Sequence, residues 1–371
     1  LGTLADDGGP GTIRVNDTVG AVASALTLAQ TGESTFDGVF VGSGSDAGDG
    51  TAQVRLDQAN ADDGVLTLTG SSLLSGAFRI IDGILSLDEA SGGAEVLANT
   101  MWVAVGSAGT LRVKSDETLR SVGDNTGTTA GASTDGVAGD STTGNGTIEI
   151  DGGIILSVGN SDAFNTQFTG NVTDGGAGTG GGSLHKIGTS TLRLANVAGG
   201  HTASDYSGET KVLAGLLEVS GEGVGDTSKV TVDGDADLTL LASETIGSLE
   251  TDTSDTDTDT SELTADVILT GSGTVLTTGG NDVSTRYAGL ISGDGGLFKA
   301  GTGSTFTIDR AGSSQNTFVS ALTIDAGVVE ITGGGAIADS TSVVLNRPDS
   351  GKNVKLLVSA SEEINTLSSD T

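Results

Sequence analysis

The chain has 371 residues, with 49 acidic against 16 basic side chains and a formal net charge of −33. It contains 62 glycines, 2 prolines and no cysteine. This charge excludes direct binding to nucleic acid, and the missing cysteine excludes disulfides, thiolate nucleophiles and cysteine-ligated metals. The longest apolar runs are only a few residues, so no transmembrane segment is predicted.

Short apolar runs recur along the whole chain and end at Gly, Asp, Asn or Ser. Segments such as Leu111-Arg112-Val113 and Leu192-Arg193-Leu194 alternate aliphatic with polar residues. In a strand, successive side chains point to opposite faces, so this alternation indicates one buried and one solvated face. No stretch keeps a helical apolar period. The sequence therefore predicts an all-β fold.

Three patterns recur in the same order. The first is an acid followed by Thr and an aliphatic residue, at Asp17-Thr18-Val19, Glu117-Thr118-Leu119, Glu244-Thr245-Ile246 and, in a weaker copy, Glu363-Ile364. The second is an aromatic residue two positions before a glycine, at Phe36/Gly38, Phe168/Gly170 and Tyr287/Gly289. The third is a glycine followed by aliphatic residues, at Gly83-Ile84-Leu85, Gly215-Leu216-Leu217 and Gly327-Val328-Val329.

The spacing of these patterns defines units of roughly 110–130 residues, each long enough for several coils of about 20–25 residues. About 15–18 coils are then expected in the chain. The predicted units are 1–61 (partial), 62–180, 181–294 and 295–371 (partial). Both ends fall inside repeats, so we expect a segment of a longer polypeptide. Because such short strands cannot bury enough surface alone, the repeats predict a continuous β-solenoid over 1–371, with a thin aliphatic core.

The later repeats resemble a known family. Gly295-Gly296-Leu297-Phe298-Lys299-Ala300-Gly301-Thr302-Gly303, followed by Ala326-Gly327-Val328, is similar to the autotransporter-associated β-strand repeat of large bacterial surface proteins. The similarity is good over 181–371 and fainter over 1–180. The resemblance implies a right-handed parallel β-helix that is secreted and displayed at the bacterial cell surface.

Catalytic residue types are scarce. The two histidines are His185 and His201, and His185 aligns with Phe298 of the next repeat, which indicates a structural or surface role. No serine or acid is spaced to pair with His201, and most acids fall at turn or outward positions. We therefore expect no enzyme and no cofactor, with an acidic surface that keeps an extracellular protein soluble.

Two insertions occur at the corner that follows the acid-containing pattern, over 123–146 and 250–262. Insertions that map to one face of a solenoid often mark a binding face. The second insertion carries Asp252, Asp255, Asp257 and Asp259. Their carboxylates could gather Ca²⁺ if the loop were extended. The alternative is a solvated loop without metal.

Trp102, the single tryptophan, precedes Val103-Ala104-Val105 and aligns with Lys229 and Ser342. These are outward positions, so Trp102 is expected at the surface, where it could contact a sugar or another chain. A covering loop is the alternative.

These observations favour a non-enzymatic, extracellular surface rod with a structural or adhesive role. Its expected ligand is a glycan or another cell-surface molecule. The first alternative is a self-assembling subunit of a filament or surface layer, which associates laterally or end to end because open solenoid ends expose unpaired strands. The second alternative is a polysaccharide-binding or polysaccharide-degrading β-helix.

Overall fold

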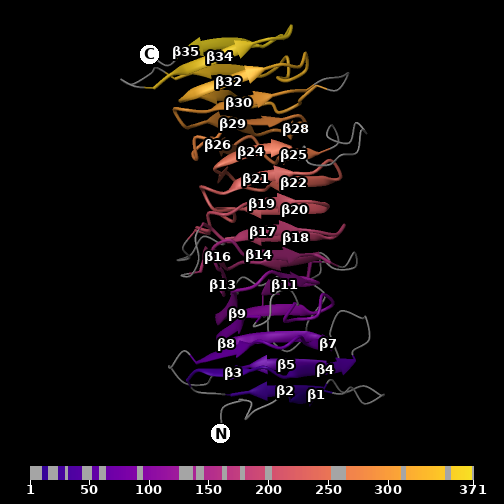
Figure 1. The fold of residues 1–371 in the computed structure, drawn as a ribbon. Coiled ribbons are helices and arrows are strands. Elements are labelled where there is room, and N and C mark those ends of the chain that lie inside the picture. The colour runs from indigo at the N-terminus through magenta and orange to yellow at the C-terminus, as the bar shows by residue number, and fades with distance from the viewer. Residues whose placement is uncertain are drawn as a thin grey trace. The chain divides into compact units, whose positions relative to one another are not determined.

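The computed structural model describes residues 11–15, 24–29, 32–43, 52–57, 64–89, 95–124, 137–138, 146–160, 165–175, 180–196, 203–251, 265–310, 315–346 and 352–369. The chain divides into two units, 1–202 and 203–371. In both units the described residues form strands and turns and no helix, and the paired strands are parallel (Figure 1). The predicted all-β solenoid is confirmed.

Unit 1 contains the strands β1 to β18. Their bounds are β1 Thr12–Arg14, β2 Ser24–Leu28, β3 Ser34–Phe36, β4 Val39–Ser43, β5 Ala52–Leu56, β6 Val65–Leu68, β7 Leu73–Ser75, β8 Ala77–Leu87, β9 Trp102–Val113, β10 Glu117–Leu119, β11 Ser121–Asp124, β12 Val137–Ala138, β13 Thr147–Ile150, β14 Ile155–Val158, β15 Asn165–Phe168, β16 Asn171–Asp174, β17 Ser183–Lys186 and β18 Thr191–Ala195. Within this unit the strand orders are β1-β4-β7, β2-β5-β8-β9-β13-β16, β10-β14-β17 and β12-β15-β18, with β3-β6 joined to β8 and β11 to β9.

Unit 2 contains the strands β19 to β35. Their bounds are β19 Thr210–Val212, β20 Gly215–Ser220, β21 Lys229–Val232, β22 Ala236–Leu240, β23 Glu244–Thr245, β24 Ser248–Thr251, β25 Asp266–Leu269, β26 Val275–Thr278, β27 Thr285–Tyr287, β28 Leu290–Gly293, β29 Gly296–Lys299, β30 Thr305–Ile308, β31 Leu322–Ile324, β32 Gly327–Ile331, β33 Ser342–Leu345, β34 Val354–Val358 and β35 Thr366–Ser369. The strand orders are β19-β21-β24, β20-β22-β25-β28, β23-β26-β29-β31-β33-β35 and β27-β30-β32-β34.

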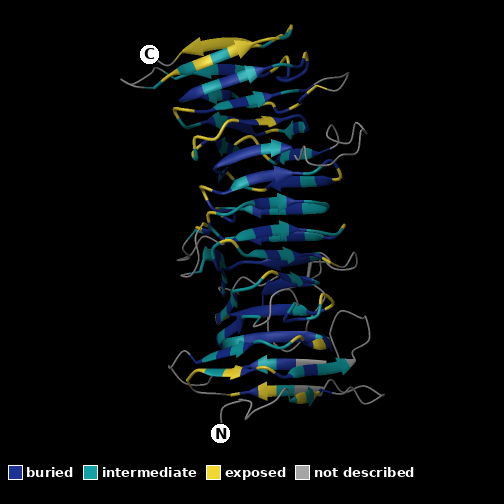
Figure 2. Ribbon diagram, in the orientation of Figure 1, coloured by how far each residue is buried: buried dark blue, intermediate teal, exposed yellow. Residues whose placement is uncertain are grey.

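The core of each unit consists of aliphatic rows that continue from coil to coil. In unit 1, Val54, Phe78 and Val103 are register partners on β5, β8 and β9, and all three are buried. In unit 2, Leu297 and Leu322 form an equivalent buried pair on β29 and β31. Figure 2 shows the resulting alternation of buried and intermediate residues along the strands. Burying each such side chain contributes about 1.5–3 kcal/mol, so the rows hold the coils together.

Coil length varies more than the sequence predicts. Lys229 pairs with Ser248 in the next coil, whereas Thr110 pairs with Thr147, which lies almost twice as far along the chain. The expected 15–18 coils are therefore too many, and the described residues form about 11 turns. The physical reason is that a long insertion at a corner lengthens its coil without adding a further coil to the stack.

The aromatic residue of the second pattern covers its glycine. A methyl group on Gly289 would lie 2.6 Å from the hydroxyl oxygen of Tyr287 and would overlap with the carbonyl oxygen of Ala265. The same holds for Gly170 beneath Phe168, where the overlap is with the carbonyl oxygen of Gly146. The N–H of Leu290 donates to the Ala265 carbonyl at 2.8 Å, so the missing side chain lets one coil dock on the previous one.

The third pattern places glycine where the backbone turns with positive φ. The φ angles are 93° at Gly83, 67° at Gly215 and 75° at Gly327. Residues with a Cβ rarely adopt this left-handed region, so glycine is required at each of these positions, directly before the aliphatic residues.

The acid of the first pattern holds two backbone N–H groups about one coil earlier in the chain. The N–H groups of Val96 and Leu97 donate to the carboxylate of Glu117 at 3.0 and 2.7 Å. Those of Gly223 and Val224 donate to Glu244 at 3.3 and 3.0 Å. Burial raises the pKa of both carboxyls to about 8, although these hydrogen bonds oppose the shift.

The fourth copy of this acid is Glu362, and the sequence assignment to Glu363 is wrong by one position. The N–H groups of Ala336 and Ile337 donate to Glu362 at 3.3 and 2.9 Å. The register supports this assignment, because Ser342 pairs with Thr366 as Lys229 pairs with Ser248. The first copy, 17–19, lies outside the described residues.

A buried lysine closes a turn at two equivalent positions, Lys186 at the end of β17 and Lys299 at the end of β29. Lys299 is 1% exposed, and its Nζ donates to the carbonyl oxygens of Ala300 and Gly301 and to Oγ of Ser304. Lys186 donates in the same way to the carbonyls of Ile187 and Gly188. Burial lowers the pKa of Lys299. The lysine thus satisfies carbonyl groups that the turn leaves without strand partners.

We expect Lys299→Met to lower the free energy of unfolding by about 2 kcal/mol, because two carbonyl groups and a hydroxyl lose their donor. Chemical unfolding followed by far-UV circular dichroism measures this change. The control is Lys355→Met, which removes an exposed lysine from β34 of the same unit. This control should change stability by less than about 0.5 kcal/mol. Equal effects of the two substitutions would contradict the capping role.

Candidate ligand-binding surface

The outer face of unit 1 carries a row of small hydroxyl side chains that ends in a cation. Thr35 pairs with Thr67 on β3 and β6, Thr67 with Ser86 on β6 and β8, and Ser86 with Arg112 on β8 and β9. Their neighbours in each strand, such as Leu66, Leu85 and Leu111, are buried in the core. Alternation therefore directs this row away from the core, although Ser86 itself is only 2% exposed. Successive members of such a row are about 4.8 Å apart.

A groove of about 600 Å³, which we call the Arg112 groove, lies over this row. The described residues that line it are Glu33, Ser34, Thr35, Val65, Thr67, Ser86, Arg112 and Lys114. Its lining combines hydroxyl groups, one apolar side chain, one acid and two cations.

Both cations are held by neighbouring acids. Arg112 Nε donates to Glu149 at 2.5 Å, and Lys114 Nζ donates to Asp88 at 2.9 Å. All four side chains are about one-quarter to two-fifths exposed. The guanidinium engages Glu149 through Nε, and among the described residues its two Nη groups have no protein partner. The ion pair therefore fixes the orientation of Arg112 while leaving donors for a ligand.

A second groove, of about 410 Å³, surrounds His185 in the same unit. Its described lining residues are Glu89, Glu95, Asp116, Glu117, Thr118, Ile155, Ser157 and His185. Ser157 and His185 are register partners on β14 and β17. Glu117 uses its carboxylate oxygens for the N–H groups of Val96 and Leu97, so it serves the fold at this position.

Trp102 lies at the start of β9 and is half-buried. Its ring stacks with the guanidinium of Arg79 on β8, whose central carbon is 5.2 Å from the ring centroid. Its register partners Ala77 and Ser121 are buried. A role for Trp102 in contacting a ligand stays a prediction.

The expected calcium ligands Asp252, Asp255, Asp257 and Asp259 lie outside the described residues, as does His201. So do the greater parts of the insertions 123–146 and 250–262. Within the ranges that the structure describes, no group of three or more His, Asp or Glu side chains could hold a metal ion.

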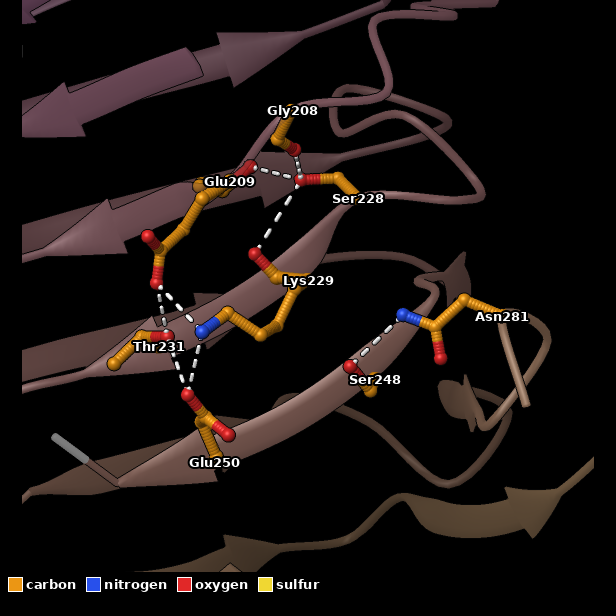
Figure 3. Close-up of polar contacts among 9 residues, drawn as sticks. Gly208, Glu209, Ser228, Lys229, Thr231, Ser248, Glu250 and Asn281 are labelled. Atoms are coloured by element: carbon orange, nitrogen blue, oxygen red, sulfur yellow. Dashed lines mark hydrogen bonds and ion pairs between the residues drawn. The ribbon is translucent and has the colours of Figure 1, made fainter. Parts of the chain in front are cut away.

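Unit 2 presents a compact charge cluster on its outer face, drawn in Figure 3. Lys229 Nζ lies 3.2 Å from Glu209 and 2.7 Å from Glu250, and the hydroxyl of Thr231 donates to Glu209 at 2.6 Å. Burial opposes ionisation of Glu209, but the hydrogen bonds from Thr231 and Lys229 outweigh it and lower the pKa of this carboxyl. The single ammonium is shared by the two carboxylates, and all three groups have partners within the cluster, so we assign it a stabilising role.

The sequence did not reveal the Arg112 groove. Thr35, Thr67, Ser86 and Arg112 are separated by stretches of unequal length, so no fixed period joins them. The register of the coils would have been needed to align them. The one available signal is Leu111-Arg112-Val113, whose alternation places Arg112 outward.

No family model and no solved structure matches the chain. Over 210 residues, or 54% of its length, it is 27% identical to the adhesin BmaC autotransporter of Brucella suis biovar 1 (strain 1330). The chain spans about 6% of the length of that relative. Together with the stacked parallel coils, this similarity confirms the autotransporter-like resemblance found in the sequence. Among the described residues no helix is long and apolar enough to cross a membrane.

Proposed function

We propose that this chain is a non-enzymatic, extracellular adhesive segment of a bacterial surface protein. The observation that carries the proposal is its similarity to an autotransporter adhesin over more than half of its length. Stacked coils with a narrow core suit this role, because they present a large outer surface relative to their mass. The adhesin similarity supports a location at the cell surface or outside the cell.

Adhesion is tested with the purified chain, fluorescently labelled and applied to cultured epithelial cells at increasing concentration. We expect saturable binding that an excess of unlabelled chain displaces. A heat-unfolded sample of the same chain is the control for charge and composition. Binding that does not saturate, or that the unfolded sample reproduces, would overturn the proposal.

The non-enzymatic part is tested separately. We expect no release of reducing ends when the chain is incubated with a panel of plant, bacterial and animal polysaccharides. Release that grows with time and with protein concentration would instead support the polysaccharide-degrading alternative.

A second candidate function is self-assembly by stacking of coils. Leu367 on β35 is 60% exposed, although its register partner Val343 is buried in the core row. An exposed apolar side chain in a core row favours pairing of this strand with a strand of a second copy of the chain. Sedimentation velocity at rising concentration tests this. Reversible assembly that Leu367→Lys abolishes would support it, and a monomer throughout would contradict it.

A further inference from the structure

We propose that the Arg112 groove on the outer face of unit 1 binds a saccharide that carries a carboxylate group. This inference rests on the proposed adhesive function and names the ligand class and the site. The groove belongs to β3, β6, β8 and β9 and to the residues beside them.

The concavity has a structural origin in side-chain size. Thr35, Thr67 and Ser86 occupy successive coils with short side chains, whereas Arg112 and Lys114 are long. The hollow therefore follows the direction of stacking and is bounded at one end by the two cations. Positions that repeat at about 4.8 Å suit a ligand that is itself built of successive rings.

The groups that line the groove match the chemistry of a sugar. Hydroxyls both donate and accept hydrogen bonds, so Thr35, which is exposed, and Thr67, which is partly exposed, can pair with sugar hydroxyls in either sense. Val65 supplies an apolar contact for the C–H face of a ring. The residue types therefore favour a polyhydroxylated ligand over an apolar one.

The cations add preference for a carboxylate. Arg112 is oriented by Glu149 through Nε, and a guanidinium offers further N–H groups in a planar fork that matches a carboxylate. Lys114 follows directly after β9 and lines the same groove. In a chain of net charge −33, most of the surface repels an anion. Each cation is paired with an acid and Glu33 also lines the groove, so what Arg112 offers a carboxylate is the hydrogen-bond donors of its Nη groups rather than a net positive charge.

Binding is tested by isothermal titration calorimetry of the full chain with oligogalacturonate. We expect binding that weakens as NaCl is raised, since the attraction is partly electrostatic. A neutral galacto-oligosaccharide of the same length should bind about tenfold more weakly or worse. Equal affinity for the charged and the neutral sugar would overturn the preference for a carboxylate. Polyglutamate carries carboxylates but no sugar, so equal affinity for polyglutamate and oligogalacturonate would overturn the assignment of a saccharide as the ligand.

Two variants test the position of the site. Arg112→Gln should weaken oligogalacturonate binding about tenfold or more. Its matched control is Arg286→Gln, which removes an arginine that pairs with Asp309 through Nε at 2.7 Å in unit 2 and should leave binding unchanged. Thr67→Leu fills the hollow without changing charge and should also weaken binding. Circular dichroism verifies that each variant is folded.

The outcomes separate this inference from the adhesive function. Cell adhesion that persists unchanged in Arg112→Gln and Thr67→Leu would overturn the groove as the ligand site while leaving adhesion intact. Oligogalacturonate binding without cell adhesion would support the groove and contradict the proposed function. Unweakened oligogalacturonate binding by both variants would also overturn the assignment.

Discussion

We expect Gly289→Ala to lower the free energy of unfolding by about 3 kcal/mol, because the added methyl group overpacks a closed site. It would lie 2.6 Å from the hydroxyl oxygen of Tyr287 and closer still to the carbonyl oxygen of Ala265. Neither neighbour can withdraw easily. Tyr287 is fully buried and donates to that carbonyl, which also accepts from the N–H of Leu290.

Relief of the overlap therefore requires two coils to move apart, at the expense of these hydrogen bonds. Urea unfolding followed by far-UV circular dichroism measures the loss of stability. The matched control is Gly273→Ala in the same unit, where a methyl group meets no atom within 4 Å. This control should change stability by less than about 0.5 kcal/mol. If the two variants unfold at the same urea concentration, close approach of the coils at Gly289 does not limit stability.

The recurrence of this aromatic–glycine pattern explains why the sequence predicted stacking. Phe168 and Tyr287 cover glycines that are both pressed against a carbonyl oxygen of the preceding coil. A pattern imposed by contact between neighbouring coils repeats wherever the contact repeats. The alignment of Trp102, Lys229 and Ser342 is confirmed for the same reason, since each begins a strand whose partner is the strand that follows the acid of the first pattern.

The features that the sequence did not predict depend on the register between coils and on the unequal lengths of the coils. The acid of the fourth copy was misplaced at Glu363 because Glu362 and Glu363 are adjacent and of the same type, and the one that faces inward is determined by register. The Arg112 groove escaped notice because its residues come from coils of unequal length. Composition alone does not determine which outward positions become neighbours across coils.

The buried acids should make stability fall as the pH rises, which is the reverse of the usual behaviour of a carboxyl in an ion pair. Burial raises the pKa of Glu244 from its ordinary value of 4.5 to about 8, and Asp226 and Glu222 add to the shift. Between these values the unfolded chain has lost the proton that the folded chain keeps. Stability from this carboxyl is therefore complete below pH 4.5 and is lost as the pH rises through about 8. The full shift corresponds to roughly 5 kcal/mol.

The variant Glu244→Gln isolates this contribution from the general repulsion of an acidic chain. At pH 5 we expect it to be less stable than the parent by about 1 kcal/mol, since an amide replaces one of two accepting oxygens with a donor. By pH 8 the difference should reverse, because the parent now bears the cost of a buried charge. The control Glu363→Gln removes an exposed carboxyl. Its difference from the parent should stay within about 0.5 kcal/mol.

The window from pH 5 to pH 8 is suited to this test because the carboxyls with lowered pKa act outside it. Asp309 and Asp325 have pKa values below 3.8, so their contributions to stability are lost only in stronger acid. Glu117 is buried and hydrogen-bonded in the same way as Glu244. We therefore expect Glu117→Gln to be less stable than the parent at pH 5 and more stable at pH 8. If the difference in the free energy of unfolding between Glu244→Gln and the parent stays constant from pH 5 to pH 8, the pKa of Glu244 in the folded state has its ordinary value. The recurring acid would then hold its two N–H groups as a carboxylate at no cost from burial.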